Sequence, residues 1–178
     1  MLFRSKVVFS PDGKYIATAS FDNTSRVWDA VTGKQIFVLK HDNWVRNVVF
    51  SPDGKYIATA SNDNTACVWD AATGKQIFVL KHDNWVNNIT FSPDGKCIAT
   101  ASWDKKAHLW SVDTGEEIFV LSHNGSVNDV VFSPDGKYIA TASADNTARV
   151  WDAATGKQIF VLKHDGVVGN VIFSPDGK

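Results

Sequence analysis

The chain has 178 residues, of which 44% are hydrophobic and 12% aromatic, and this composition excludes an intrinsically disordered protein. Its formal net charge of −1 at pH 7 provides no broad basic surface, which argues against non-specific nucleic-acid binding as its main role. No apolar run approaches the roughly 20 residues that a membrane-spanning helix needs.

An internal repeat organises the sequence. The hexapeptide FSPDGK begins at positions that are each 41 residues apart, namely Phe9, Phe50, Phe91, Phe132 and Phe173. A period of this length is typical of solenoids, propellers and other arrays in which one supersecondary unit is copied and stacked.

Each copy is predicted to contain four short strands, which we letter a to d in chain order. In the second copy these strands are VRNVVF (45–50), KYIATAS (55–61), ACVWD (66–70) and KQIFVLK (75–81). The turns between them are SPDG (51–54), NDNT (62–65) and AATG (71–74). No segment has a convincing helical period over about ten residues or more.

The predicted strands carry apolar residues on both faces, as in Tyr56 and Ile57 or in Phe78, Val79 and Leu80. A sheet with one solvated face would alternate more cleanly between apolar and polar residues. Each sheet is therefore expected to be covered on both sides by neighbouring copies, and radially stacked four-stranded sheets form a β-propeller.

In these features the chain resembles the WD-repeat family, whose signature is a Gly-His pair, a long gap and a Trp-Asp pair. Two departures occur: Lys or Ser stands where the family prefers Gly before His, and Ser111 replaces the Asp after Trp110. The matching residues are His41 with Trp69-Asp70, His82 with Trp110, His123 with Trp151-Asp152, and Trp28-Asp29 alone. The resemblance implies an all-β fold, a β-propeller of four-stranded antiparallel blades. The high uniformity of the copies is similar to that of bacterial members.

The predicted blades are 1–41, 42–82, 83–123 and 124–164, and the first of them lacks the leading histidine. Residues 165–178 are predicted to be the first strand of an incomplete fifth blade, all within one propeller domain. Because open blade faces would expose apolar surface, we expect either an open fragment of a longer propeller or a homo-oligomer. Such an oligomer could be a dimer in which two chains form one ring of about eight blades.

Each complete copy offers a histidine, a serine and an aspartate. These sets are His41, Ser61 and Asp63; His82, Ser102 and Asp104; and His123, Ser143 and Asp145. They could be nucleophilic triads, but a triad needs one cleft and one oxyanion hole, whereas these sets recur in every blade. The resemblance implies a structural network instead, in which aspartate bonds histidine, histidine bonds serine, and serine bonds the indole of Trp69, Trp110 or Trp151.

The copies differ at few positions, and several of these lie in the b–c and d–a connections, which share one end of a four-stranded blade. In WD-repeat propellers this end usually binds partners, as the resemblance implies. We therefore predict a partner-binding rim made of Phe21, Trp44, Arg46, Asn62, Trp85, Asn87, Trp103, Ser126 and Asn128. The alternative is that the aromatic residues only fill gaps at blade junctions.

The other motifs give weaker evidence of a functional site. His108 replaces the arginine or cysteine of other copies and is interpreted as a surface or packing residue. No His/Cys cluster has zinc spacing, and PDGK and TGKQ lack the pattern of a phosphate loop, so we predict no metal and no cofactor. Cys67 and Cys97 occupy unrelated positions, which argues against a disulfide and favours a reduced, cytoplasmic protein.

The resulting hypothesis is a non-catalytic WD-repeat scaffold for a protein or peptide partner of unknown identity, with no membrane partner and no nucleic acid. One alternative is a self-assembling structural module, natural or engineered, that has no partner but itself. A less favoured alternative is an enzyme with a pocket in the propeller. It would need an acid, base or metal cluster that occurs in one blade alone, and the sequence contains none that we can identify.

Overall fold

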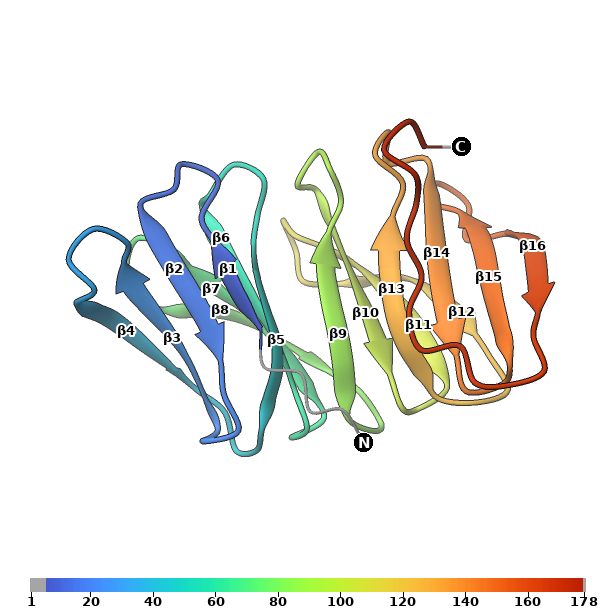
Figure 1. Cartoon of the computed structure of the whole chain (residues 1–178), viewed down its shortest axis with the longest axis horizontal. Coiled ribbons are helices and arrows are strands. Elements are labelled where there is room, and N and C mark those ends of the chain that lie inside the picture. Colours follow the sequence, from blue (N-terminus) through green and yellow to red (C-terminus); the bar gives the residue numbers. More distant parts are fainter. Residues whose placement is uncertain (1–5, 178) are drawn as a thin grey trace. The chain divides into compact units, whose positions relative to one another are not determined.

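The computed structural model describes residues 6–177 and contains four antiparallel sheets of four strands each (Figure 1). Within every sheet the strands follow chain order, so that neighbouring strands are joined by short turns. The predicted all-β fold of four-stranded antiparallel blades is confirmed. Residues 1–5 of the predicted first blade and Lys178 lie outside the described residues.

The four sheets use equivalent strands of successive repeats. The first contains β1 (Val7–Phe9), β2 (Tyr15–Ala19), β3 (Thr24–Asp29) and β4 (Gln35–Lys40). The second contains β5 (Val45–Phe50), β6 (Tyr56–Ser61), β7 (Thr65–Asp70) and β8 (Gln76–Lys81). The third contains β9 (Val86–Phe91), β10 (Cys97–Ser102), β11 (Lys106–Ser111) and β12 (Glu117–Ser122). The fourth contains β13 (Val127–Phe132), β14 (Tyr138–Ser143), β15 (Thr147–Asp152) and β16 (Gln158–Lys163).

The chain divides into two compact units, one ending at Ile89 and the other beginning at Thr90. In the first unit, Leu39 of β4 and Val48 of β5 are fully buried members of one apolar cluster that joins the first and second sheets. In the second unit, Leu121 of β12 and Val130 of β13 join the third and fourth sheets in the same way. Each core therefore lies between two sheets, as the apolar strand faces predicted.

The turns follow from their residue types. In the a–b turn of the second sheet, Ser51 Oγ donates to Asp53 Oδ1 at 2.7 Å, and Gly54 adopts a left-handed φ of 72°. The b–c turn places Asn64 at a φ of 68°, whereas the third sheet uses Lys105 there at 73°. Asparagine tolerates this backbone region better than lysine does, so the third sheet has the less favourable b–c turn.

The segment after the fourth sheet is the one predicted to begin an incomplete fifth blade, and that role stays a prediction. No strand is assigned between residues 165 and 177, because a single segment without its hairpin partner has no second strand with which to form a ladder. The segment instead runs beside β13 (Figure 1), where Asn128 Nδ2 donates to Val168 O at 3.0 Å. Asn170 Nδ2 likewise donates to Asp129 Oδ2 at 3.0 Å.

Candidate functional site

A chain of hydrogen-bonded side chains links the connection before β5 with β6 and β7. His41 Nδ1 lies 2.8 Å from Asp63 Oδ2, and His41 Nε2 lies 2.7 Å from Thr59 Oγ1. The indole Nε1–H of Trp69 donates to the same threonine oxygen at 2.9 Å. The His41 side chain is only 1% exposed, so this network lies inside the sheet.

The prediction that serine forms the middle of this network is wrong, because Thr59 holds that place. Ser61 Oγ donates instead to Asn43 O at 3.0 Å and accepts the backbone N–H of Asp63 at 3.1 Å. The register of β6 and β7 places Thr59 diagonally opposite Trp69 on one face, while Ser61 lies two residues further along the strand. A residue of the same face that lies beyond the diagonal neighbour is out of reach of the indole.

The fourth sheet uses threonine in the same way, and in every sheet a threonine accepts from the tryptophan indole. His123 of the fourth sheet lies 3.0 Å from Asp145 Oδ2 and 2.7 Å from Thr141 Oγ1, to which the Trp151 indole donates at 2.9 Å. Ser143 bonds Gly125 O instead. In the third sheet the Trp110 indole donates to Thr100 at 3.0 Å. The indole acceptors of the four sheets are Thr18, Thr59, Thr100 and Thr141.

The charge state of this network follows from its hydrogen bonds. Burial raises the pKa of Asp63, but the hydrogen bonds from His41 and Thr65 outweigh burial and hold that pKa well below its ordinary value. The ionised carboxylate can only accept, so His41 Nδ1 carries the proton that it donates. In the neutral imidazole, Nε2 then accepts from the hydroxyl of Thr59.

Threonine, histidine and aspartate thus have the hydrogen-bond order of a nucleophile, a base and an orienting acid. Thr59 and Thr141, however, are both 0% exposed, and each hydroxyl oxygen is also bonded to a tryptophan indole. A substrate cannot reach a hydroxyl group in this position. The network is therefore suited to holding strands a, b and c together rather than to catalysis.

His108 on β11 occupies a second, different cluster. It is buried, with Nε2 3.0 Å from Asp104 Oδ2 and Nδ1 2.5 Å from Glu117 Oε1. Burial by itself lowers the pKa of His108, but the two carboxylates reverse this effect and raise the pKa above its ordinary value. Arg26 and Arg149 bridge the equivalent aspartate and a glutamine in the first and fourth sheets. His108 is therefore a structural ion-pair partner where those sheets use arginine.

Five of the predicted rim residues come together in the first unit. The rings of Phe21 and Trp44 have centroids 4.9 Å apart, and Arg46 Cζ lies 5.9 Å from the Trp44 ring. Arg46 Cζ is also 5.8 Å from the Trp85 ring. Trp44 is 36% exposed, whereas Asn62 is only 5% exposed, and the role of Asn62 in partner binding stays a prediction. Asn62 supports Arg46, whose Nε–H donates to Asn62 Oδ1 at 2.7 Å.

The remaining rim residues are half-buried. Asn87 belongs to the first unit, and Trp103, Ser126 and Asn128 belong to the second. Asn128 uses its amide N–H to bond Val168 O, so it holds the segment that follows the fourth sheet. Their role in partner binding stays a prediction.

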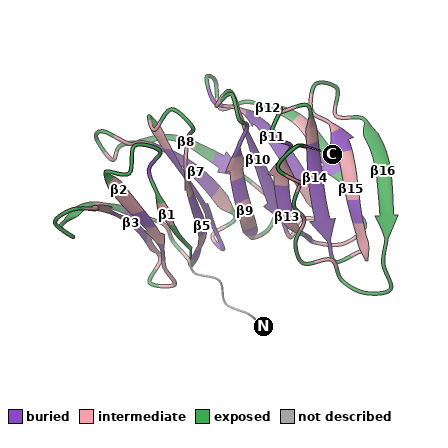
Figure 2. Ribbon diagram, turned by 45° about the horizontal axis from the view of Figure 1, so that its top comes forward, coloured by how far each residue is buried: buried purple, intermediate pink, exposed green. Residues whose placement is uncertain are grey.

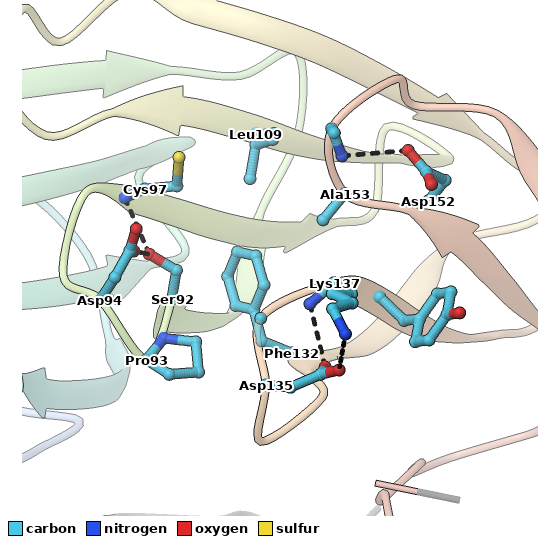
Figure 3. Close-up of a pocket in the computed structure, with 13 residues that line it drawn as sticks. Ser92, Pro93, Asp94, Cys97, Leu109, Phe132, Asp135, Lys137, Asp152 and Ala153 are labelled. Carbon is cyan, nitrogen blue, oxygen red and sulfur yellow. Dashed lines mark hydrogen bonds and ion pairs between the residues drawn. The ribbon is translucent and has the colours of Figure 1, made fainter.

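The opposite end of the second unit contains a cavity of about 720 Å³ (Figure 3). Phe132 and Leu109 provide apolar lining, and carboxylates of the SPDG and Trp-Asp turns lie at its edge. Asp94 accepts from Ser92 Oγ at 2.6 Å, and Asp135 accepts from Ser133 Oγ and pairs with Lys137. Local hydrogen bonds therefore already occupy these carboxylates, and the cavity offers no base poised for chemistry.

Cys97 also lines this cavity, and Cys67 is buried in the first unit. Burial raises the pKa of the Cys67 thiol to about 11 and raises that of Cys97 in the same direction. A raised thiol pKa reduces the fraction of reactive thiolate at neutral pH, so neither group is suited to nucleophilic catalysis.

Sequence reasoning missed Thr59, Thr141 and Glu117. The IATAS strand carries threonine and serine two residues apart on the same face, so alternation alone does not distinguish them. Glu117 did leave a signal, since glutamate replaces the glutamine of other copies in the same repeat in which histidine replaces arginine. A paired change of this kind indicates spatial contact.

Within residues 6–177 there is no group of three or more His, Cys, Asp or Glu side chains that could hold a metal ion. The described part of the chain also contains no helix that is long and apolar enough to cross a membrane.

Comparison with known proteins matches residues 7–178 to the second β-propeller of echinoderm microtubule-associated proteins. A shorter segment is 53% identical over 34 residues to the Notchless protein homolog of Arabidopsis thaliana, covering 19% of this chain and 7% of that protein. Another is 60% identical over 30 residues to ribosome assembly protein 4 of Saccharomyces cerevisiae, covering 17% of this chain and 6% of the relative. The matched segments thus span less than a tenth of either relative.

Proposed function

Because this chain belongs to the family of the echinoderm microtubule-associated protein second β-propeller, we propose that it is a non-catalytic WD-repeat scaffold. Its partner is a protein or peptide, which binds the rim formed by the b–c and d–a connections. The proposal places the protein in the cytoplasm, in keeping with its two free thiols.

One observation carries the proposal. Trp44 is 36% exposed and lies against Phe21 in the first unit, at a rim where the copies differ while their cores stay nearly identical. A cluster of tryptophan, phenylalanine and arginine has the composition of an interaction hot spot. Packing alone would not require this cluster, because Ser126 and Val167 occupy the position of Trp44 in later copies.

The rim is tested by selecting peptides from a displayed random library on the immobilised chain and measuring their affinities for variants. Trp44→Ala and Trp85→Ala should each weaken binding by about tenfold or more, because each removes a large aromatic contact. Val31→Ala is the matched control. It truncates an exposed apolar residue of a c–d turn, where other copies already carry Ala72 and Ala154.

Two results would contradict the proposal that the rim binds a peptide. One is a selection that yields no binding peptide. The other is a set of peptides that bind wild type, Trp44→Ala and Trp85→Ala with affinities within about twofold of one another.

Self-assembly is a second candidate function. It is favoured by an exposed phenylalanine on the last sheet and an uncovered glycine on the first, whose equivalents pack together within each unit. Phe37 of the first sheet packs over Gly74 of the second, where an added Cβ would lie 2.6 Å from the ring. The equivalent Phe160 lies on β16, which Figure 2 colours as exposed, and its exposed fraction is 60%. No described atom lies within 4 Å of a Cβ added at Gly33. Phe160 of one copy would pack over Gly33 of a second, extending the array toward a ring of about eight blades.

Sedimentation velocity over a range of concentrations tests self-assembly. The wild-type chain should show a species of twice the monomer mass, which Phe160→Asp should abolish, since a charge cannot be buried in that contact without a partner. Val161→Asp is the control, because Val161 is about as exposed as its equivalents Val38 and Val120. A single monomer mass for the wild type at every concentration would rule this function out.

A further inference from the structure

Arg46 is held by groups from four separate connections of the first unit. Its Cζ atom lies 6.0 Å from the Phe21 ring centroid, 5.9 Å from that of Trp44 and 5.8 Å from that of Trp85. Its Nε–H donates to Asn62 Oδ1 at 2.7 Å. Distances of this size between a guanidinium and aromatic rings correspond to cation–π contacts. The side chain is therefore positioned by the fold and pays little further ordering cost when a ligand binds.

The positive charge of Arg46 has no anionic counterpart in the described part of the chain. No carboxylate among residues 6–177 lies within ion-pair distance of this guanidinium, whereas Arg26 pairs with Asp22 at 2.8 Å and Arg149 with Asp145 at 3.1 Å. Burial lowers the pKa of Arg46, and no neighbouring acid opposes that effect. Arginine nevertheless stays protonated in proteins, so this site keeps a partly desolvated cation.

We propose that Arg46 binds the side-chain carboxylate of an aspartate or glutamate in the partner peptide. The terminal guanidinium nitrogens make no hydrogen bond within the described residues, and they match the two oxygens of a carboxylate in a planar fork. The methylene groups of an acidic side chain would lie against the rings of Trp44 and Trp85. This inference rests on the proposed peptide-binding rim and names the chemistry that the rim selects.

The repeat supplies the substitution that tests this site. The positions equivalent to Arg46 hold Asn87, Asn128 and Gly169, so a guanidinium occurs at this place in one copy alone. Asn128 lies in β13, which has the same bounds within its repeat as β5. Arg46→Asn therefore gives the second sheet a residue that the fourth sheet already accommodates, and we expect the fold to be retained.

The experiment uses an array of short synthetic peptides in matched pairs, in which one member carries Asp or Glu and the other carries Asn or Gln. On the wild-type chain, the acidic member of binding pairs should bind about tenfold more tightly than its amide counterpart. Arg46→Asn should reduce this ratio to about one, and Arg46→Lys should give an intermediate ratio because lysine lacks the planar fork. Arg26→Gln, which removes an already paired guanidinium from the same unit, should leave the ratio unchanged.

The outcomes separate this inference from the proposed function. Suppose that peptides bind and that Trp44→Ala weakens their binding. If the acidic and amide members then bind equally, or if Arg46→Asn leaves their affinity ratio unchanged, the peptide-binding rim is supported and the carboxylate site is wrong. If no peptide binds, both are wrong. Each pair is also made with a free and an amidated C-terminus. A preference that follows the terminal carboxylate instead of the side chains would overturn the assignment to Asp or Glu.

Discussion

Replacing Thr59 with valine is expected to lower the free energy of unfolding by about 3 kcal/mol, because the change leaves two buried polar groups without partners. Thr59 Oγ1 accepts from the Trp69 indole at 2.9 Å and lies 2.7 Å from His41 Nε2, and the residue is 0% exposed. Valine has nearly the same shape, so the loss reports the hydrogen bonds and not a cavity. Urea unfolding followed by tryptophan fluorescence measures it.

Thr18→Val is the matched control, since Thr18 accepts from the Trp28 indole at 3.1 Å at a half-buried position. It should cost about 1 kcal/mol. Ser61→Ala should also cost less than Thr59→Val, because among the described residues the Ser61 hydroxyl bonds backbone groups of Asn43 and Asp63 and no side chain. If Ser61→Ala were the most damaging of the three changes, the threonine network would be assigned incorrectly.

Replacing Gly74 with alanine is expected to destabilise the first unit by about 3 kcal/mol, from backbone strain and a steric clash together. Gly74 has a left-handed φ of 67°, and an added Cβ would lie 2.6 Å from Cδ1 of Phe37. The Phe37 ring belongs to the preceding sheet, so it can move only by disturbing the packing between the two sheets. Unfolding in urea, at a protein concentration where the wild type has the monomer mass, measures the loss.

Gly33→Ala separates the two causes. Gly33 has the same φ of 67° at the same place in its repeat, but no described atom lies within 4 Å of its added Cβ. It should cost only the strain of the left-handed backbone, about 1 kcal/mol. A shorter side chain at the neighbouring position, Phe37→Leu, should recover part of the Gly74→Ala loss. Equal losses for the two glycine changes would show that the contact with Phe37 is not tight.

The sequence predicted the fold more completely than the candidate site. The turn residues and apolar strands of one 41-residue copy predicted four strands per sheet, and the described sheets have those strands in that order. These features depend on local conformational preferences, which neighbouring residues in the chain decide. The same local rules predicted the first strand of a fifth blade within residues 165–178. Residues 165–177 contain no strand, since a strand forms only where a partner strand is present, and the fifth blade stays a prediction.

Local sequence patterns did not correctly predict which hydroxyl side chain joins the histidine network. Thr59 and Ser61 share one face of one strand, and both can donate and accept hydrogen bonds. The register against β7 decides between them, because it brings Thr59 to the Trp69 indole. Likewise, the sequence predicted Asn62 at the rim but not its burial beneath Arg46.

By itself, then, the sequence determined the repeat, the strands, the turns and the end of each blade at which the copies vary. It did so because strand alternation and turn chemistry act over a few residues. Only the tertiary structure decided that threonine completes the histidine network and that Phe21, Trp44 and Trp85 surround the guanidinium of Arg46. These contacts join residues from different strands and different repeats, and their distances depend on sheet register and on the packing of one sheet against the next.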